Sequence, residues 1–185
     1  MANFWVQVGE KAICENKAVD FGDLVKPFGR KYKGMWRIFG ISEYGEIMLV
    51  SNECIGEIRL SGFAGYSMGV DRLDQLCIDT VKSSKVAAVR SITGLDISKL
   101  NEDRMHLLLS LFGQKYWLAT EFKYSSAISC VVGLEAIVDD ARIDLPLEAF
   151  EGSHHEYDRT LGVRAIVTLR KNVEFHRTKQ GYWEI

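Results

Sequence analysis

The side chains with the most obvious potential for chemistry lie together at His154-His155-Glu156-Tyr157-Asp158, where two imidazoles stand beside two carboxylates. Both groups bind zinc and other divalent cations. Adjacent residues of an extended strand point to opposite faces, so His154 and His155 can share one ion only if the chain turns between them. A solvent-exposed loop is the simpler interpretation, and we predict no metal site here.

Two further segments carry residue types that bind phosphate. Gly62, Gly65 and Gly69 could form a glycine-rich cradle, but no Lys-Ser or Lys-Thr ends the segment and no strand-loop-helix unit surrounds it. The basic run at 30–33 is short, and the net charge of −2 with a pI of about 6.1 gives it no wider basic context. We predict a glycine-aromatic loop at 61–69, a solvated turn at 30–33, and neither a nucleic-acid nor a membrane partner.

Common catalytic signatures are missing from the sequence. Gly-x-Ser-x-Gly, His-Glu-x-x-His, a P-loop and a paired Cys and His are all absent. The cysteines are far apart and form no Cys-x-x-Cys pair: Cys14, Cys54, Cys77 and Cys130. Without a secretion signal, such cysteines are more often buried thiols than disulfides. We predict that the protein is not an enzyme and uses no cofactor.

Length and composition favour one folded domain spanning residues 1–185. The 185 residues are 47% hydrophobic, and two prolines against 16 glycines favour many short elements joined by tight turns. Short apolar or alternating runs bounded by glycine or charge predict strands. These are an N-terminal hairpin within 1–20, a central hairpin of 35–41 and 46–50, single strands at 55–60, 113–120, 127–134 and 162–169, and an edge hairpin of 173–175 and 182–185.

Two helices are predicted between these strands. The first begins with Asp71 as its N-cap. Residues at helical spacing define its two faces: Leu73, Leu76, Cys77 and Val81 inward, and Asp74, Asp79 and Lys82 outward. The second begins near Thr93 or Asp96 and ends before Gly113, and because its apolar pattern is interrupted at 101–104, two shorter helices are the alternative. Two helices among antiparallel strands give an α+β fold.

A long excursion at residues 121–160 separates the two strongest strand candidates. An ordered excursion between core strands commonly carries function. Its candidate binding side chains are aromatic or imidazole groups: Tyr124, Phe150, His154 and Tyr157. No apolar run approaches the roughly 18 residues of a membrane-spanning helix, and the N-terminus lacks the basic and apolar regions of a signal peptide. We therefore expect synthesis in a cytoplasm.

Several short motifs in a fixed order resemble a domain that is common in phages and prophages of Firmicutes. Members of that family read like WRVLGV, LLVS, LN-LC, ARS, YWLAS and GVRPVVSLKSNV. The matching segments of this chain lie within residues 22–173: Trp36–Ile41, Met48–Ser51, Leu73–Cys77, Val89–Ile92, Tyr116–Thr120 and Gly162–Val173. The resemblance implies a divergent C-type lectin-like fold, in which two helices pack on a twisted antiparallel sheet that supports a long loop excursion.

The resemblance also implies a role. Family members resemble virion structural or surface-display modules, so we expect a non-enzymatic bacteriophage virion protein that decorates or stabilises the capsid, or the tail, through protein–protein contacts. Its expected partners are phage capsid or tail proteins and further copies in a homo-oligomer, and its expected location is the virion after synthesis in the host bacterial cytoplasm. The alternative is a receptor-binding or host-surface glycan-binding module of a phage tail or surface protein, with its contacts on the excursion.

For individual residues, the resemblance implies structural roles only. Trp36, Trp117 and Arg164 are expected to be core or support residues. The chain departs from the family in having Ala165 where proline is usual, and in a shorter, more charged excursion, which weakens the case for glycan binding. Lectin-like folds often bind calcium through several oxygen ligands. The candidate carboxylates are read here as surface acids, because the Glu-Pro-Asn type of calcium tripeptide is absent: Glu121, Glu135, Asp139, Asp140 and Asp144.

Overall fold

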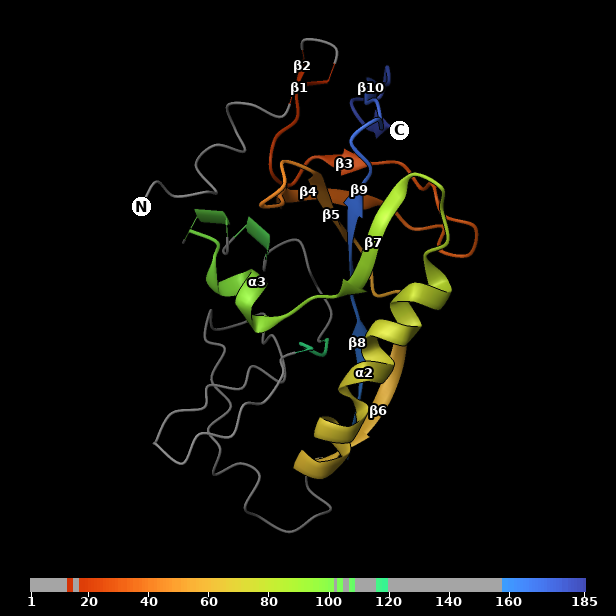
Figure 1. Cartoon of the computed structure of the whole chain (residues 1–185), viewed down its shortest axis with the longest axis vertical. Coiled ribbons are helices and arrows are strands. Elements are labelled where there is room, and N and C mark those ends of the chain that lie inside the picture. Colours follow the sequence, from red (N-terminus) through yellow and green to blue (C-terminus); the bar gives the residue numbers. More distant parts are fainter. Residues whose placement is uncertain (1–12, 15–16, 102, 105–106, 109–115, 120–157) are drawn as a thin grey trace.

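The structure is a computed structural model that describes residues 13–14, 17–101, 103–104, 107–108, 116–119 and 158–185. Within this part the fold is α+β, with a sheet-rich core and two helices (Figure 1). The predicted fold class is therefore confirmed at this level. No helix in the described part is both long and apolar enough to cross a membrane.

The main sheet has seven strands in the order β10-β11-β3-β4-β5-β9-β7. Neighbouring strands are antiparallel except β11 and β3, which run parallel. In spatial order the strands are β10 (His176–Arg177), β11 (Trp183–Glu184), β3 (Leu24–Val25), β4 (Trp36–Ile41), β5 (Ile47–Ser51), β9 (Ala165–Leu169) and β7 (Val86–Ser91). Two smaller sheets pair β1 (Ile13–Cys14) with β2 (Lys17–Ala18), and β6 (Gly56–Ser61) with β8 (Asp158–Val163).

The central hairpin of β4 and β5 forms as predicted. Its turn is closed by a 2.7 Å hydrogen bond from Ser42 N to Glu46 O, and Gly45 supplies the positive φ of 78°. Trp36 and Leu49 on these strands have no exposed surface, because they pack in a hydrophobic cluster with side chains of α2 and of other strands. This hairpin is the middle of the hydrophobic core.

The first helix, α2 (Gly62–Thr80), is longer than predicted. The glycine-aromatic loop at 61–69 was a wrong prediction, and Asp71 lies inside the helix rather than at its N-cap. The glycines allow close packing of α2 on β6: a Cβ on Gly69 would lie 2.4 Å from Leu60 Cδ2, and one on Gly56 would lie 3.1 Å from Leu76 Cδ2. Gly69 therefore allows close helix–strand packing and does not form a turn. Because residues 62–69 are helical, the loop that a phosphate cradle would require does not form.

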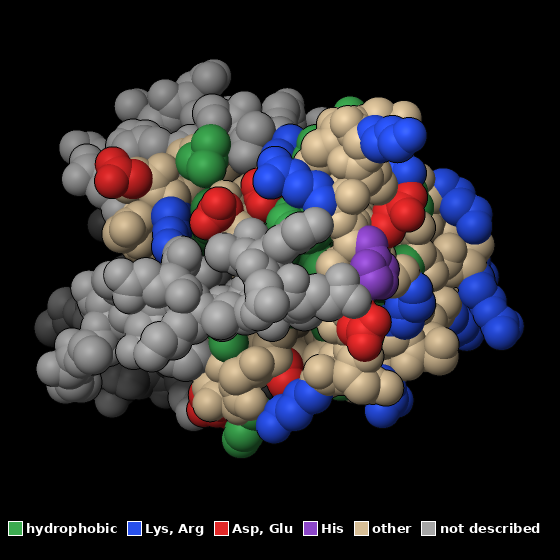
Figure 2. All heavy atoms as spheres, turned by 90° about the horizontal axis from the view of Figure 1, so that it is seen from above, with side chains coloured by type: hydrophobic (Ala, Val, Ile, Leu, Met, Phe, Trp, Pro, Cys, Tyr) green, Lys and Arg blue, Asp and Glu red, His purple; other side chains and the backbone are tan. Residues whose placement is uncertain are grey.

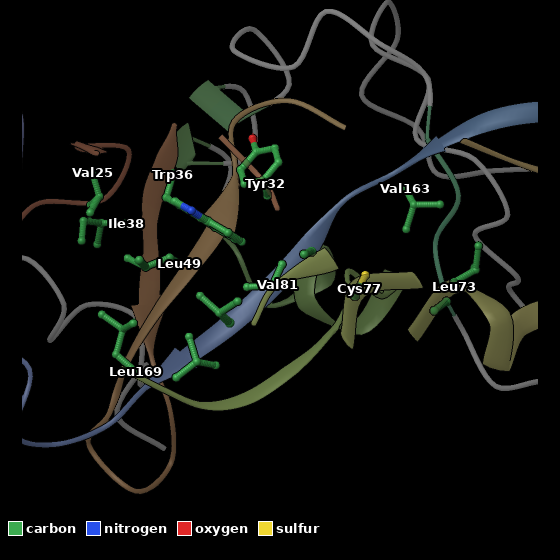
Figure 3. Packing of buried hydrophobic residues seen from close by; sticks show 14 of the residues in the cluster. Val25, Tyr32, Trp36, Ile38, Leu49, Leu73, Cys77, Val81, Val163 and Leu169 are labelled. Atoms are coloured by element: carbon green, nitrogen blue, oxygen red, sulfur yellow. The ribbon is translucent and has the colours of Figure 1, made fainter. Parts of the chain in front are cut away.

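The inward stripe of α2 is confirmed, because Leu73, Cys77 and Val81 are at most 3% exposed. Figure 3 shows them in one cluster with Val163 and Leu169 from the strands. The prediction for the opposite face was wrong in one respect. Asp79 and Lys82 are exposed, but the partly buried Asp74 accepts hydrogen bonds from β7.

The second helix, α3 (Gly94–Ser98), begins where the sequence predicted. Thr93 is its N-cap: Thr93 Oγ1 accepts from Asp96 N, and the Asp96 carboxylate accepts from Thr93 N in return. The helix ends at Ser98, and the described residues 103–104 and 107–108 are helical again, so the alternative of two shorter helices fits better than one continuous helix.

The predicted strand at 162–169 is two strands that meet at Arg164. β8 pairs with β6, whereas β9 pairs with β5 and β7, so the chain crosses here from the small sheet into the main one. Only residues 116–119 of the predicted strand at 113–120 are described, and there Tyr116 forms an isolated parallel bridge to Gly162.

The C-terminal strands form one edge of the main sheet. A C-terminal edge hairpin forms as predicted, from β10 and β11, but its first strand is His176–Arg177 and not 173–175. Gly181 in its turn has a positive φ of 87°, and β11 lies beside β3. Near the N-terminus β1 and β2 pair within the predicted hairpin region 1–20, while residues 1–12 lie outside the described part.

The three cations of the turn at 30–33 are exposed, as predicted for a solvated turn, but Tyr32 between them is buried. Tyr32 is only 8% exposed, and its hydroxyl lies 3.1 Å from Met35 O and accepts from Glu53 N at 3.2 Å. Its ring packs edge-on against Trp36 (Figure 3), at 5.1 Å between centroids. Phe28 stacks on the same indole at 5.2 Å. Two aromatic anchors therefore fix this loop on the core.

Because of the Tyr32 hydroxyl, the free energy of unfolding should decrease at alkaline pH. Burial raises its pKa from 10.0 to about 12. The folded state therefore holds this proton more tightly than the unfolded state, so its contribution is complete below pH 10 and is lost as pH rises towards 12. Tyr32→Phe removes this dependence but also removes hydrogen bonds that contribute about 1 kcal/mol.

We expect wild type to be more stable than Tyr32→Phe at pH 8 and the difference to shrink steadily above pH 10. Urea unfolding followed by tryptophan fluorescence measures both free energies of unfolding. Tyr182→Phe, at an exposed tyrosine, is the matched control and should track wild type throughout. A constant difference between wild type and Tyr32→Phe from pH 8 to pH 11 would show that this hydroxyl is not held as described.

Candidate functional site at the Arg164 junction

Arg164 is a buried cation at the point where β8 ends and β9 begins. Its side chain is 1% exposed, although charged groups are rarely buried without strong partners. Arg164 Nη1 donates to Ser51 O at 2.9 Å and to Asn52 O at 2.7 Å. The guanidinium carbon lies 5.0 Å from the centroid of the Tyr116 ring, a cation–π contact. The side chain thus ties the end of β5 to residue 116.

The backbone around Arg164 joins four elements. Its carbonyl accepts from Ile92 N, after β7, at 3.0 Å, and the Cys77 sulfur of α2 lies 4.0 Å from the same oxygen. Ala165 N donates to Ser51 Oγ at 3.1 Å, and Ile55 N donates to Val163 O at 2.8 Å. We call this set of contacts the Arg164 junction: Ser51, Asn52, Ile55, Cys77, Ile92, Tyr116, Val163, Arg164 and Ala165.

Burial sets the protonation states of the junction. It lowers the pKa of Arg164, and it raises the pKa of the Tyr116 hydroxyl and of the half-buried Cys54 thiol; the Arg164 charge opposes both of the latter shifts. Both acids therefore stay protonated at neutral pH. A thiol needs its thiolate form to act as a nucleophile, so the junction holds Cys54 in an unreactive form.

The junction also frames the segment of residues 120–157. Just before it, Trp117 N donates to Gly162 O at 2.9 Å, and Ala119 N donates to Ile92 O at 2.9 Å. Trp117, 5% exposed, also donates from its indole nitrogen to Ile58 O at 2.8 Å. Since Gly162 follows the segment in sequence, residues on its two sides are held together at one place in the fold.

A second buried cluster fixes α3 and α2 to β7. Arg90 forms a two-pronged ion pair with Asp96, with nitrogen–oxygen distances of 2.5 and 2.6 Å, and Thr93 N donates to the same carboxylate at 2.8 Å. Asp74 Oδ1 accepts from both Ser91 N and Ser91 Oγ at 2.6 Å. Burial lowers the pKa of Arg90, but the bonds to Asp96 outweigh it and the pKa rises. The two carboxylates therefore accept hydrogen bonds that join α2 and α3 to β7.

The predicted site residues fall into two groups. Trp36, Trp117 and Arg164 are all buried. The excursion's candidate binding residues and candidate calcium ligands lie outside the described residues: Tyr124, Phe150, His154, Tyr157, Glu121, Glu135, Asp139, Asp140 and Asp144. His155 and Glu156 also lie outside it, and the described part contains no group of three or more His, Cys, Asp or Glu placed to hold a metal ion.

Sequence reasoning missed most of the polar contacts of the site. The Thr93-to-Asp96 spacing is a capping-box pattern, so that part was detectable. The pairing of Asp96 with Arg90 and of Asp74 with Ser91 depends on how β7 lies against both helices, which no local pattern specifies. Ser51 gave no signal either, since its hydroxyl bonds a residue 114 positions away.

Comparison of the chain with protein-family models, with curated proteins and with solved structures gives no match. What the protein does is therefore inferred from its own residues and contacts.

Replacing Arg164 by methionine should destabilise the protein strongly. The change keeps much of the side-chain volume but leaves two buried carbonyls without their charged donor, so we expect the free energy of unfolding to fall by about 3 kcal/mol. Urea unfolding followed by tryptophan fluorescence measures the change. Arg177→Met is the matched control, because Arg177 also lies over a ring, that of Trp183 at 5.6 Å, but is exposed. Similar losses in both variants would contradict the role given to Arg164.

Proposed function

We propose that this chain is a non-enzymatic bacteriophage virion structural protein that decorates or stabilises a capsid or a tail through protein–protein contacts. The observation that carries the proposal is the Arg164 junction. Its buried ionisable group binds backbone carbonyls and an aromatic ring, and thereby holds strands from distant parts of the chain. Such use of buried polar groups suits a scaffold that docks rather than reacts.

The ordered motifs supply the phage assignment. Trp36 begins β4, Ser51 ends β5 and Arg164 links β8 to β9, so three of the motif segments meet in the core. A set of short motifs that converges on one interior place is what a common fold requires, even when surface residues differ. This convergence supports a relation to the phage and prophage domain.

The finer fold that we propose is C-type lectin-like. Two features support it: β3 and β11, which are far apart in the sequence, lie side by side, and Tyr116 and Trp117, which precede the segment 120–157, are bonded to Gly162, which follows it. In such a fold the sheet and helices form the support, and the long segment presents a surface.

The alternative function is receptor or host-glycan binding through the segment of residues 120–157. The specific observation in its favour is the anchoring of the two flanks of this segment by Trp117, Ala119 and Gly162. A firmly held base reduces the entropy cost of presenting a contact surface. Under this alternative the aromatic and imidazole side chains at Tyr124, Phe150, His154 and Tyr157 would make the contacts.

The virion assignment predicts a stoichiometric component of purified particles. Particles from a host that carries the gene should be banded in a density gradient, treated with protease-free nuclease and quantified by mass spectrometry. We expect this chain at a copy number comparable to that of other structural proteins, and we expect it to stay with the particles through the purification. A phage-encoded replication protein serves as the carry-over control. Detection at or below the level of that control would contradict the assignment, and enrichment on host cells but not on particles would favour the alternative.

A further inference from the structure

Three separate stretches of the chain are basic and contain no acidic residue. They are residues 26–33, 82–85 and 170–173. We call seven of their cations the basic surface: Arg30, Lys31, Lys33, Lys82, Lys85, Arg170 and Lys171. Lys26 is left out because it pairs with Glu184. No single stretch is long enough to indicate a ligand.

The fold brings these stretches together. Arg30 N donates to Lys82 O at 3.3 Å, and Arg170 N donates to Lys85 O at 2.9 Å. Arg170 Nε also donates to Ser84 O at 3.0 Å. The loop 82–85 therefore lies between the other two, and the seven cations belong to one continuous part of the molecule. Figure 2 shows Lys and Arg side chains gathered along the right-hand edge of the view, with the acidic side chains that are visible lying further in.

The charges of this surface are largely available to a ligand. Six of the seven side chains belong to exposed residues, and Lys85 is half-buried, with its ammonium group bonded to Ile185 O. Lys82 has one carboxylate nearby, Asp79 at 3.8 Å, in an exposed pair of small energetic value. Within the described residues the remaining five make no ion pair with a carboxylate: Arg30, Lys31, Lys33, Arg170 and Lys171.

The surface is built on fixed backbone. Phe28 and Tyr32 anchor the loop 26–33 on Trp36, and the other two loops are bonded to each other next to the ends of β7 and β9. A set of cations held at fixed spacing attracts an extended polyanion more strongly than the same charges spread over the molecule. The net charge of −2, from 23 basic and 25 acidic residues, conceals this local concentration.

The composition of the basic surface favours a phosphate backbone over an acidic protein. Five of the seven cations are lysine: Lys31, Lys33, Lys82, Lys85 and Lys171. Lysine is depleted in protein–protein interfaces, where arginine and aromatic residues are enriched. Phosphate groups accept lysine as a simple point charge, and such binding needs no particular base sequence. We propose that the basic surface binds the phosphodiester backbone of nucleic acid without sequence preference, a property beyond the structural role proposed above.

Fluorescence anisotropy of the full chain with labelled double-stranded DNA of about 20 base pairs, long enough for several phosphate contacts, tests this proposal. We expect binding at low salt that weakens steeply as salt is raised. If four or five phosphates are neutralised, the slope of log K against log salt should be about −4. A scrambled DNA of equal length should bind equally well.

Lys31→Glu combined with Lys171→Glu removes two cations from different loops without touching any described side-chain bond. It should weaken binding at least about tenfold at low salt and make the salt slope shallower. The matched control is Arg72→Glu combined with Lys99→Glu, which changes the net charge equally at exposed positions of α2 and next to α3. This control should lose far less affinity, and thermal unfolding should show that both variants fold like wild type.

Three results would overturn the proposal: no binding of DNA at low salt, equal losses in the two double variants, or binding of poly-L-glutamate as tight as binding of DNA. The last result would assign the surface to an acidic polypeptide partner. Lys31→Gln combined with Lys171→Gln provides a second test without charge reversal, and it should give an intermediate loss. Each outcome is independent of whether the chain is found in virions.

Discussion

The structure depends on a single crossing of the chain, where residues 163–165 leave the small β6–β8 sheet and enter the main sheet. A backbone that changes sheets leaves polar groups without strand partners, and buried groups of this kind must be bonded elsewhere. Arg164 and Ser51 supply those bonds to the end of β5, and Ile92 and Ile55 bind the carbonyls of Arg164 and Val163. These bonds join the crossing to β5 and to the residues that follow β5 and β7, and so hold the two sheets in one core.

This constraint explains why the buried and partly buried ionisable groups of the described residues bind other parts of the fold. Arg164 fixes the crossing, while Asp96 and Asp74 hold α3 and α2 against β7 on either side of it. Burial keeps Cys77 protonated, so α2 contributes a small apolar contact there rather than a reactive thiol. The described surface carries the basic loops next to the ends of β7 and β9, and residues that flank the segment 120–157 are bonded near the crossing.

Local patterns in the sequence were sufficient where one stretch decides the outcome. The β4–β5 hairpin, the Thr93 cap and the C-terminal hairpin all follow from short-range spacing and turn residues. Local patterns failed where packing decides the outcome. The run 61–69 reads as a loop, but α2 begins at Gly62, and Gly69 permits its close approach to Leu60 of β6. The run 162–169 reads as one strand, but it divides at Arg164. The basic surface was likewise invisible, because its three loops are brought together only by the fold.

Native-state hydrogen exchange of individual amides tests the central claim most directly. If the crossing holds the two sheets together, the amides of Ile55, Ile92 and Ala165, which bond across it, should exchange only when the whole protein unfolds. The amides of Val173 and Gly181, in turns near the C-terminus, serve as the internal reference for local opening. Exchange of the crossing amides at the rate of these turn amides would contradict the account.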